Sequence, residues 1–370
     1  MPRSAEISSV VTQAATDAGF DLVGIAPVDD APELEHFPRW IAAGHAGEMK
    51  YLEARDEQGR LKRASLAHAA PWARSVVVCA INYNTEQPYS TQVPGSGRGW
   101  ISRYAWGRQD YHDSVMPRLR QVEAALREAC GTDELITRCY VDTGPIVERV
   151  AAKYAGIGWI GKNTCIINQK IGSWLFLGVM LTSLDLIRDL EPGLPSPDRC
   201  GSCTRCIDAC PTDALIAPYQ LDSNKCISYL TIEKRGEIPQ DEELRSEMGR
   251  HVFGCDICQD VCPWNRKAPA TKAAEFQPRE ALVNPALDWL AEMSAEEFSS
   301  TFRGSPVRRA KRAGLRRNAV IAMGNSGDPK FLPVLDKLAT DEDVVVAESA
   351  AWAVRKLTEI QIKNNTDRPS

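Results

Sequence analysis

The chain has 370 residues, of which 44 are basic, 49 are acidic and 12 are cysteines. Its hydrophobic content of 44% and charged content of 25% are those of an ordinary globular protein, which excludes a fibre and a largely disordered chain. The length suggests two or three domains. The net charge of −5, taken alone, argues against a nucleic-acid partner.

Residues 1–190 alternate between helical and strand patterns. In chain order we expect a helix at Ile7–Ala18, strands at Asp21–Ala26 and Ser75–Tyr83, a helix at Ser114–Cys130, a strand at Leu135–Asp142, a helix from Pro145 and two strands within Cys165–Leu186. This order predicts an α/β domain over residues 1–190. A proline-rich stretch then leads into a cysteine-rich domain at 191–265, a helical bridge at 266–302 and a C-terminal module at 303–370.

The N-terminus and the longest apolar stretch indicate where the protein works. Residues 1–20 lack a basic start followed by an apolar core, so we expect no secretory signal and a cytoplasmic protein with reduced cysteines. The longest apolar stretch, residues 172–187, is interrupted by Ser173, Thr182 and Asp185 and is shorter than the ~20 residues that a membrane span needs. We therefore expect no membrane partner.

Eight of the twelve cysteines lie between Cys200 and Cys262, a density that indicates soft-ligand metal chemistry. The first run reproduces C-x2-C-x2-C-x3-C-P, in which three thiolates hold one [4Fe-4S] cluster and the fourth ligates another; it consists of Cys200, Cys203, Cys206, Cys210 and Pro211. A second, shorter run consists of Cys255, Cys258, Cys262 and Pro263, and Cys226 supplies the eighth thiol.

The crossover rule of two-cluster ferredoxins divides these thiols between two sites. Cluster one takes Cys200, Cys203, Cys206 and Cys262, and cluster two takes Cys210, Cys226, Cys255 and Cys258. The alternative is a pair of structural zinc sites, which use separated C-x2-C pairs and no C-x3-C-P run. Two adjacent clusters carry single electrons, so we expect redox chemistry in this protein or in a partner. To Cys79, Cys130, Cys139 and Cys165 we assign only packing.

The C-terminal part contains a weak internal repeat. Asn318–Gly324 and Ser349–Arg355 are similar helical segments 31 residues apart. This period suggests a short HEAT-like module of stacked helix pairs, which would present a concave binding surface. Because arrays usually need three or more repeats, a plain helical cap on the preceding domain is the alternative.

A block of basic residues changes the argument from charge. Between Phe298 and Gly327 there is no acidic residue, and the seven basic ones leave the rest of the chain at −12; they are Arg303, Arg308, Arg309, Lys311, Arg312, Arg316 and Arg317. A solvated helix face usually mixes both signs of charge, whereas a segregated basic block is typical of phosphate-backbone binding. We therefore expect nucleic acid to contact Arg308, Arg309, Lys311, Arg312, Arg316 and Arg317, with a solvated face as the alternative.

Two motifs resemble cofactor sites but lack a required part. Gly156–Asn163 matches G-x-G-x-x-G and most of G-x4-G-K-[ST], yet it follows a helical pattern and has Asn163 where a Mg²⁺-binding hydroxyl is needed. Asp110-Tyr-His112 resembles the start of the D-x-H-x-x-G motif that gives cobalamin a histidine ligand, but Val115 stands in place of the glycine. We expect neither a nucleotide-binding loop nor a histidine-ligated cobalamin.

Asp142 ends the last strand before a turn, Thr143-Gly-Pro145, that leads into a helix. An aspartate at this position can be a turn or capping residue. A carboxyl at a strand end beside a pocket is equally a natural proton donor. The local pattern leaves both roles open.

Several motifs together extend the comparison beyond the cysteines. They are Asp142-Thr-Gly-Pro145, Gly158-Trp-Ile-Gly-Lys-Asn-Thr164, Gly172-Ser-Trp174, Ser228-Tyr-Leu-Thr-Ile-Glu233 and Phe253-Gly-Cys-Asp-Ile-Cys-Gln-Asp-Val-Cys-Pro-Trp264. With them the chain closely resembles the epoxyqueuosine reductase family over residues 5–360. The resemblance implies a cobalamin-binding α/β domain like that of the reductive dehalogenases, a bacterial ferredoxin-like domain with two [4Fe-4S] clusters, and C-terminal α-helical HEAT-like repeats.

The family reduces epoxyqueuosine to queuosine at the wobble position of tRNA, with base-off cobalamin that receives electrons from the clusters. The resemblance makes Asp142 the proton donor for the departing oxygen. It also places Arg63, Ser102, Arg103, Asp142, Lys162, Asn163 and Ser173 around the corrin, and the basic residues on the anticodon stem-loop. One departure is Gly107-Arg-Gln-Asp-Tyr-His112, which has one residue more than the family's G-R-D-Y-H and puts the contacts of Arg108 and Asp110 in doubt.

The resemblance further implies an external electron donor of flavodoxin or ferredoxin type, and a complete set of parts in one chain makes us expect a monomer. Two other functions fit parts of the sequence. One is a ferredoxin-type electron carrier that docks to a partner enzyme through the repeats, and the other is a small-molecule reductive dehalogenase-like enzyme. The basic block favours tRNA over a small substrate, which would have no use for it.

Overall fold

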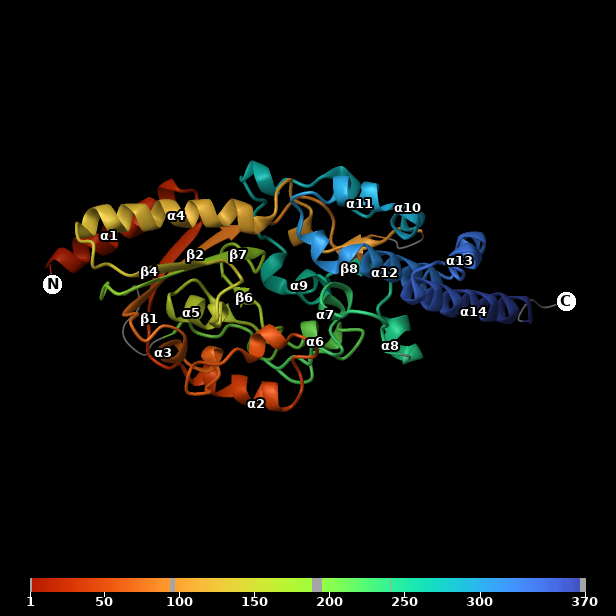
Figure 1. The fold of residues 1–370 in the computed structure, drawn as a ribbon, viewed down its shortest axis with the longest axis horizontal. Helices are drawn as coiled ribbons and strands as arrows, with labels where there is room; N and C mark the ends of the chain where they lie inside the picture. The colour runs from red at the N-terminus through yellow and green to blue at the C-terminus, as the bar shows by residue number, and fades with distance from the viewer. Residues whose placement is uncertain (1, 94–96, 188–194, 240, 367–370) are drawn as a thin grey trace.

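The computed structural model describes residues 2–93, 97–187, 195–239 and 241–366. A four-stranded sheet with its covering helices forms one end of the molecule, and the C-terminal helices form the other (Figure 1). The segment with the eight clustered cysteines lies between these two ends.

The sheet is antiparallel throughout, with strand order β1-β2-β7-β4. Its strands are β1 (Leu22–Pro27), β2 (Ser75–Asn82), β7 (Leu175–Thr182) and β4 (Thr137–Tyr140). Every residue of β2 is buried, as expected for a valine-rich strand between two neighbours and two layers of helices. β1, β2 and β4 confirm three predicted strands within two residues at each end, and β7 is one of the two strands predicted within Cys165–Leu186.

Helices cover both faces of this sheet (Figure 1). On one face α1 (Pro2–Asp17) packs against α4 (Tyr111–Cys130), and their apolar side chains meet those of the strands in a common core. On the other face lie α5 (Glu148–Tyr154) and α3 (Leu66–Ala69). The Asp110 side chain caps α4, and Gly131 ends it in the left-handed conformation, with φ +63°. The helix predicted from Pro145 begins at Glu148.

Shorter elements connect this α/β layer with the rest of the chain. Before β2 come η1 (Pro32–Glu35), α2 (His36–Ala42), η2 (Lys50–Glu53) and η3 (Lys62–Ala64); after it come η4 (Ser90–Gln92), β3 (Trp100–Ile101) and η5 (Arg103–Ala105). The hairpin of β5 (Trp159–Ile160) and β6 (Ile166–Ile167) follows α5. The Gly156–Asn163 segment therefore enters a β-hairpin. A phosphate-binding loop would instead lead into a helix.

The cysteine-rich segment consists of short helices around its two cysteine runs. They are α6 (Arg205–Asp208), α7 (Ile227–Ile232), α8 (Glu242–Glu247), α9 (Ile257–Asp260) and η6 (Pro263–Asn265). Strand β8 (His251–Phe253) immediately precedes the second run and pairs in parallel with β3. This pairing joins the segment to a loop of the first 190 residues.

The remaining helices complete the C-terminal end. They are η7 (Ala274–Phe276), η8 (Glu280–Leu282), α10 (Leu287–Glu292), α11 (Ala295–Thr301), η9 (Pro306–Ala310), α12 (Lys311–Asn325), η10 (Pro329–Phe331), α13 (Leu332–Leu338) and α14 (Val344–Thr366). The repeat segments Asn318–Gly324 and Ser349–Arg355 lie in α12 and α14, which pack so closely that a Cβ on Gly324 would lie 2.9 Å from Cβ of Ala353. The HEAT-like character of these helices stays a prediction.

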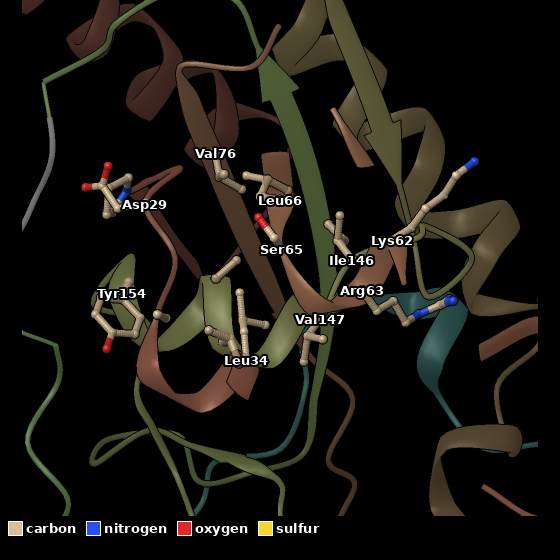
Figure 2. A pocket seen from close by; sticks show the side chains of 14 residues that line it. Asp29, Leu34, Lys62, Arg63, Ser65, Leu66, Val76, Ile146, Val147 and Tyr154 are labelled. Atoms are coloured by element: carbon tan, nitrogen blue, oxygen red, sulfur yellow. The ribbon is translucent and has the colours of Figure 1, made fainter. Parts of the chain in front are cut away.

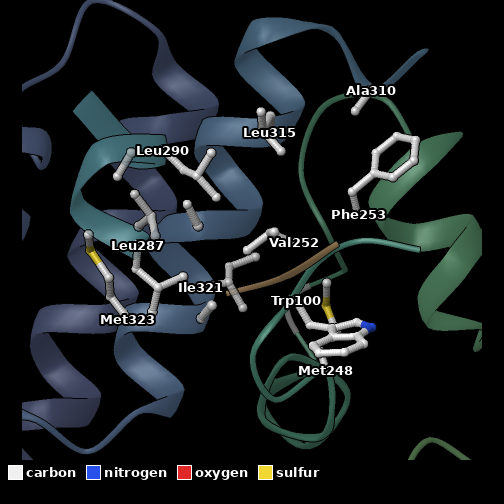
Figure 3. Packing of buried hydrophobic residues seen from close by; sticks show 14 of the residues in the cluster. Trp100, Met248, Val252, Phe253, Leu287, Leu290, Ala310, Leu315, Ile321 and Met323 are labelled. Carbon is white, nitrogen blue, oxygen red and sulfur yellow. The ribbon is translucent and has the colours of Figure 1, made fainter. Parts of the chain in front are cut away.

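One hydrophobic core runs through the cysteine-rich and C-terminal parts (Figure 3). Trp100 and Phe253 pack in it together with Leu287 and Ile321. The domain boundaries predicted at 265 and 302 therefore fall inside a continuous core, because β3 and β8 bring distant segments onto α12. The boundary predicted at 190 lies outside the described residues. In the part of the chain that the structure describes, no helix is both long and apolar enough to cross a membrane.

Candidate functional site

Asp142 lies in the turn between β4 and α5, exposed at the edge of the sheet, with φ +59°. Its carboxylate Oδ2 accepts a hydrogen bond of 2.9 Å from the Tyr111 hydroxyl, at the start of α4. Its main-chain N donates to Oε1 of Glu148, at the start of α5, over 2.8 Å. Two helices that begin at this edge therefore fix the side chain and the main chain of one aspartate.

Arg63 supports the same turn from η3. Its Nη2 donates to the carbonyl of Gly144 over 2.7 Å, and its Nη1 donates to the carbonyl of Tyr51 over 2.9 Å. The Arg63 side chain is buried, and burial lowers the pKa of its guanidinium. Nearby acidic groups, including Asp142, raise this pKa and so offset part of the effect of burial. A buried positive group is thus bonded to the turn.

Two tyrosines separate Asp142 from the cysteine-rich segment. Tyr104 contacts Tyr111 at a ring-centroid distance of 6.0 Å and Phe253, two residues before Cys255, also at 6.0 Å. Burial raises the pKa of both phenols, and the nearby Asp142 carboxylate raises it further. Both hydroxyls therefore stay protonated at neutral pH, and Tyr111 acts as a hydrogen-bond donor to the aspartate.

The eight cysteines of the two runs form two neighbourhoods. In the first, Cys262 packs beside Cys200; burial raises the pKa of Cys262 to about 11, and the Cys200 and Cys206 thiols add to this shift. Cys203 and Cys200 likewise lie beside Cys206. The second neighbourhood holds Cys210, Cys226, Cys255 and Cys258. These are the same two sets of four that the crossover rule gives. Among the described residues, no three side chains of Cys, His, Asp or Glu converge closely enough to hold a single metal ion.

Cys165, to which we assigned only packing, also contacts the cysteine runs. Its thiol shares a hydrogen bond with Cys258, and it also lies near Cys226 and Cys262. It therefore stands between the two groups of four. Cys79, Cys130 and Cys139 are buried in the core of the α/β layer, as predicted.

Lys162 and Asn163 contact the cysteine runs. Lys162 Nζ donates to the carbonyls of Gly201 and Cys203 over 2.6 and 3.0 Å. Asn163 Nδ2 donates to the carbonyl of Cys258 over 3.3 Å. The polar groups predicted to face a corrin are thus engaged by both cysteine runs, because the β5–β6 hairpin lies across them.

Three further predicted corrin contacts are also buried and bonded within the protein. Ser102 and the main-chain N of Arg103 donate to Asp256, and the Arg103 guanidinium donates to carbonyls at Thr85, Gln87 and Pro88. The Ser173 hydroxyl accepts from Gln259 and Asn265, each over 2.9 Å. In this arrangement the three residues tie the α/β layer to the second cysteine run. Of the predicted corrin contacts, Asp142 is exposed, and Arg63 is buried and bonded to the Asp142 turn.

The predicted nucleic-acid contacts divide into buried and exposed residues. Arg317 and Arg316 are 1% and 4% exposed. Arg316 pairs with Asp341, and Arg317 donates to carbonyls of Leu230, Lys234 and Gly236. The prediction that these two arginines contact nucleic acid is therefore wrong for this conformation, because the fold uses both guanidinium groups.

The other basic residues of this set remain closer to solvent. Arg308, Arg309 and Lys311 are exposed, and Arg312 is partly buried with Nε bonded to the carbonyl of Met293. Arg309 forms two hydrogen bonds with the Glu233 carboxylate and lies 5.8 Å from the centre of the exposed Tyr51 ring. Arg308 and Lys311 are thus the most accessible members of the predicted basic surface.

A small cavity of about 50 Å³ borders η3 and α5, lined mainly by apolar side chains such as Leu66, Val76 and Ile146 (Figure 2). Lys62 and Arg63 border it, and Figure 2 shows their side chains extending away from its apolar part. It has room for a few water molecules and is far too small for a macrocycle.

Sequence reasoning missed Tyr104, Tyr111, Glu148 and Cys165. Tyr111 belongs to the segment set aside as an incomplete cobalamin motif, and Glu148 lies three residues after the D-T-G-P segment that begins at Asp142. Attention to polar residues just after Asp142 could have found Glu148, whereas Tyr111 lies 31 residues before Asp142. Nothing local marks Cys165, because its partner Cys258 is far away in the sequence.

Two family models match the chain. One, described as "Epoxyqueuosine reductase QueG", matches residues 63–143, and the other, described as "4Fe-4S double cluster binding domain", matches residues 199–265. Among curated proteins, the epoxyqueuosine reductase of Pseudomonas aeruginosa is 39% identical over 359 residues, covering 96% of each chain. That of Gloeobacter violaceus is 41% identical over 334 residues, covering 88% of this chain and 98% of its own.

Solved structures agree with this comparison. A crystal structure of epoxyqueuosine reductase with an epoxyqueuosine-modified tRNA-Tyr stem loop superposes with a TM-score of 0.82 at 30% identity, covering 99% of this chain and 95% of that one. The Bacillus subtilis epoxyqueuosine reductase, in a structure whose catalytic aspartate loop is swung out of the active site, has a TM-score of 0.81 at 30% identity, with coverage of 99% and 95%.

Proposed function

The chain belongs to the epoxyqueuosine reductase family, and we propose that it reduces epoxyqueuosine to queuosine at the wobble position of tRNA, with Asp142 as the proton donor. It is an oxidoreductase that acts on tRNA. The observation that carries the proposal is the exposed Asp142 carboxylate, which Tyr111 orients next to an aromatic path from the cysteine-rich segment.

The two groups of four thiols would each hold one [4Fe-4S] cluster. Cluster one would take Cys200, Cys203, Cys206 and Cys262, and cluster two would take Cys210, Cys226, Cys255 and Cys258. The donor set fits, because eight thiols in two separate neighbourhoods are the ligands that two such clusters need. The match to a double-cluster family model over residues 199–265 supports this assignment.

Base-off cobalamin is the second proposed cofactor, and the donor set beside Asp142 suits it. His112 lies next to Tyr111 and binds Asp110 through Nδ1 over 2.8 Å, and Val115 replaces the glycine of the histidine-ligating motif. Tyrosines and the Asp142 turn would therefore border the corrin, without a histidine ligand. When bound, cobalamin would pass electrons from the clusters to the epoxide carbon.

The protein's own residues would manage the protons. Removing the epoxide oxygen as water while forming an alkene takes two electrons and two protons. Asp142 would hold a proton for the departing oxygen, and general acids of this kind typically accelerate a step by ~10² to 10⁴. The Tyr111 hydroxyl donates to Oδ2, which leaves Oδ1 to carry that proton toward the substrate. We infer that the Asp142 turn, like the aspartate loop of the Bacillus subtilis enzyme, can leave this position.

The tRNA would lie over the exposed basic residues near this turn. We assign phosphate contacts to Arg308 and Lys311, with Arg309 held beside Tyr51 by Glu233. Contacts of this type position the nucleic acid without reading its sequence. Selectivity among tRNAs must therefore come from recognition of the modified base at the active site. The C-terminal helices would form the HEAT-like support for the stem-loop.

An external one-electron donor, of flavodoxin or ferredoxin type, would reduce the clusters. We further propose that the enzyme works as a cytoplasmic monomer, since one chain holds the eight thiols, the proton donor and the basic surface.

The test uses anaerobically prepared protein with reconstituted clusters, incubated with and without cobalamin. We expect a corrinoid absorption band that stays with the protein, and conversion of epoxyqueuosine to queuosine in an anticodon stem-loop. A protein that holds clusters but neither retains cobalamin nor converts the base would instead be an electron carrier. Retained cobalamin with reduction of small halogenated compounds, and none of the modified RNA, would indicate a dehalogenase-like enzyme.

A further inference from the structure

The main chain at Asp142 is in a conformation that L residues rarely adopt. Its φ of +59° lies in the left-handed region, where the side chain approaches the following carbonyl. Aspartate tolerates this region better than most residues do, but a turn that depends on it needs other contacts to persist. The contacts of this turn therefore decide how the catalytic carboxyl is presented.

Glu148 makes the contact that acts on the main chain of Asp142. Its Oε1 accepts the hydrogen bond from the Asp142 N over 2.8 Å. Glu148 is the first residue of α5, and the residue before it, Val147, provides no side-chain cap. The carboxyl thus reaches back from the helix to the turn, and it leaves both oxygens of Asp142 for Tyr111 and the substrate.

The other contacts of the turn act on different atoms. Arg63 donates to the carbonyl of Gly144, and the Tyr111 hydroxyl donates to Oδ2 of Asp142. Gly144 also packs against the Tyr140 ring, where an added Cβ would lie 2.6 Å from Cγ of that ring. None of these contacts fixes the peptide N of Asp142, so Glu148 supplies a restraint that they do not duplicate.

The protonation state of Glu148 allows it to lie beside the Asp142 carboxylate. Burial raises the pKa of Glu148 to about 8, and repulsion from the Asp142 carboxylate adds to this effect, while the hydrogen bond from the Asp142 N, and then Arg149 and Arg63, oppose it. Near neutral pH the side chain is therefore largely protonated. A protonated carboxyl still accepts a hydrogen bond through Oε1, and it places no second negative charge against Asp142.

We propose that Glu148 is a positioning residue that holds the main chain of Asp142 in the conformation that presents its carboxyl to the substrate. This inference rests on the proposed role of Asp142 as proton donor and adds a residue that touches neither substrate nor cofactor. Without Glu148, the strained turn would spend more time away from the site.

Glu148→Ala and Glu148→Gln separate this role from a general effect on folding. We expect Glu148→Ala to lower kcat about tenfold, the effect of losing one hydrogen bond, with an unchanged KM for the stem-loop. Glu148→Gln keeps an acceptor oxygen in the same place, so it should remain within about threefold of the parent enzyme. Glu242→Ala, the same change at the first residue of another short helix, is the control and should have no effect.

Amide hydrogen exchange of the peptide that contains Asp142 gives a second measurement, which depends on no turnover. Exchange of this peptide should be faster in Glu148→Ala than in the parent and unchanged in Glu148→Gln. Equal exchange in all three proteins would overturn the inference, as would a Glu148→Gln enzyme as slow as Glu148→Ala.

A double-variant cycle distinguishes this inference from the proposed function. In an Asp142→Asn background, Glu148→Ala should cause no further loss, because it acts only through Asp142. A further tenfold loss there would contradict the positioning role. Full activity of Asp142→Asn alone would instead contradict the proposed function.

Discussion

Arg317 gives a prediction that decides whether the basic block serves the fold or the tRNA. Its guanidinium is buried in α12 and donates to the carbonyls of Leu230, Lys234 and Gly236 over 2.7, 3.1 and 2.6 Å. These carbonyls lie at and beyond the C-terminal end of α7, where a positive group is favoured. Burial lowers the pKa of Arg317 to about 10, so it stays charged at neutral pH.

Arg317→Met should therefore destabilise the protein strongly. Methionine keeps much of the side-chain volume but leaves three carbonyls without this donor, and each buried group without a partner costs ~1–3 kcal/mol. Allowing for partial relaxation, we expect a loss of about 3–5 kcal/mol in the free energy of unfolding. Lys311→Met changes an exposed residue of the same helix, and its effect should stay within ~0.5 kcal/mol.

Urea unfolding followed by far-UV circular dichroism measures both changes, and filter binding measures the affinity for an anticodon stem-loop. We expect Arg317→Met to lower the unfolding midpoint and Lys311→Met to leave it unchanged. If Arg317→Met were as stable as the parent but bound the stem-loop more weakly, the structural role assigned to Arg317 would be refuted.

Three further predictions follow from the same contacts. Replacing Arg308 and Lys311 together by glutamate should weaken stem-loop binding and flatten its salt dependence, with cluster content unchanged; equal affinity at low salt would rule out this surface. Cys165→Ala should shift the reduction potential of cluster two in an electron paramagnetic resonance titration, because it removes a thiol that lies against Cys258, while Cys79→Ala in the distant core should not; identical potentials would count against a role for Cys165. Glu148→Gln should change the pH dependence of stability: the pKa of Glu148 is raised from 4.5 to about 8 in the folded protein, so the parent loses stability as the pH rises through this range and the variant does not. The thermal midpoint of Glu148→Gln relative to the parent should thus increase from pH 5 to pH 9, and a constant difference would contradict the raised pKa.

The sequence predicted those features that depend on local pattern. The apolar runs of β2 and β7 identify buried strands, and the cysteine spacing separates two groups of four thiols because the chain between ligands is short. Asp142 was found as a candidate by its place between a strand and a helix. The resemblance then supplied the role that local pattern left open.

Features that depend on contacts between distant segments could not be predicted in this way. Charge counting treats Arg317 and Lys311 alike, but one packs on the end of α7 and the other faces solvent. Lys162 and Ser173 are polar residues in glycine-rich motifs, which suggests a ligand, yet their partners are protein groups in the cysteine runs. Whether a polar group is buried depends on which distant segments pack together. The spacing of residues within one segment does not show this.

The proposed proton donor in the reduction of epoxyqueuosine is Asp142. The most direct test of this role is single-turnover conversion of an epoxyqueuosine-containing stem-loop by Asp142→Asn, compared with the parent enzyme at equal cluster and cobalamin content. Asparagine preserves the shape and the Tyr111 contact but carries no acidic proton, so the rate should fall by ~10² or more. A rate within a few fold of the parent would contradict the account.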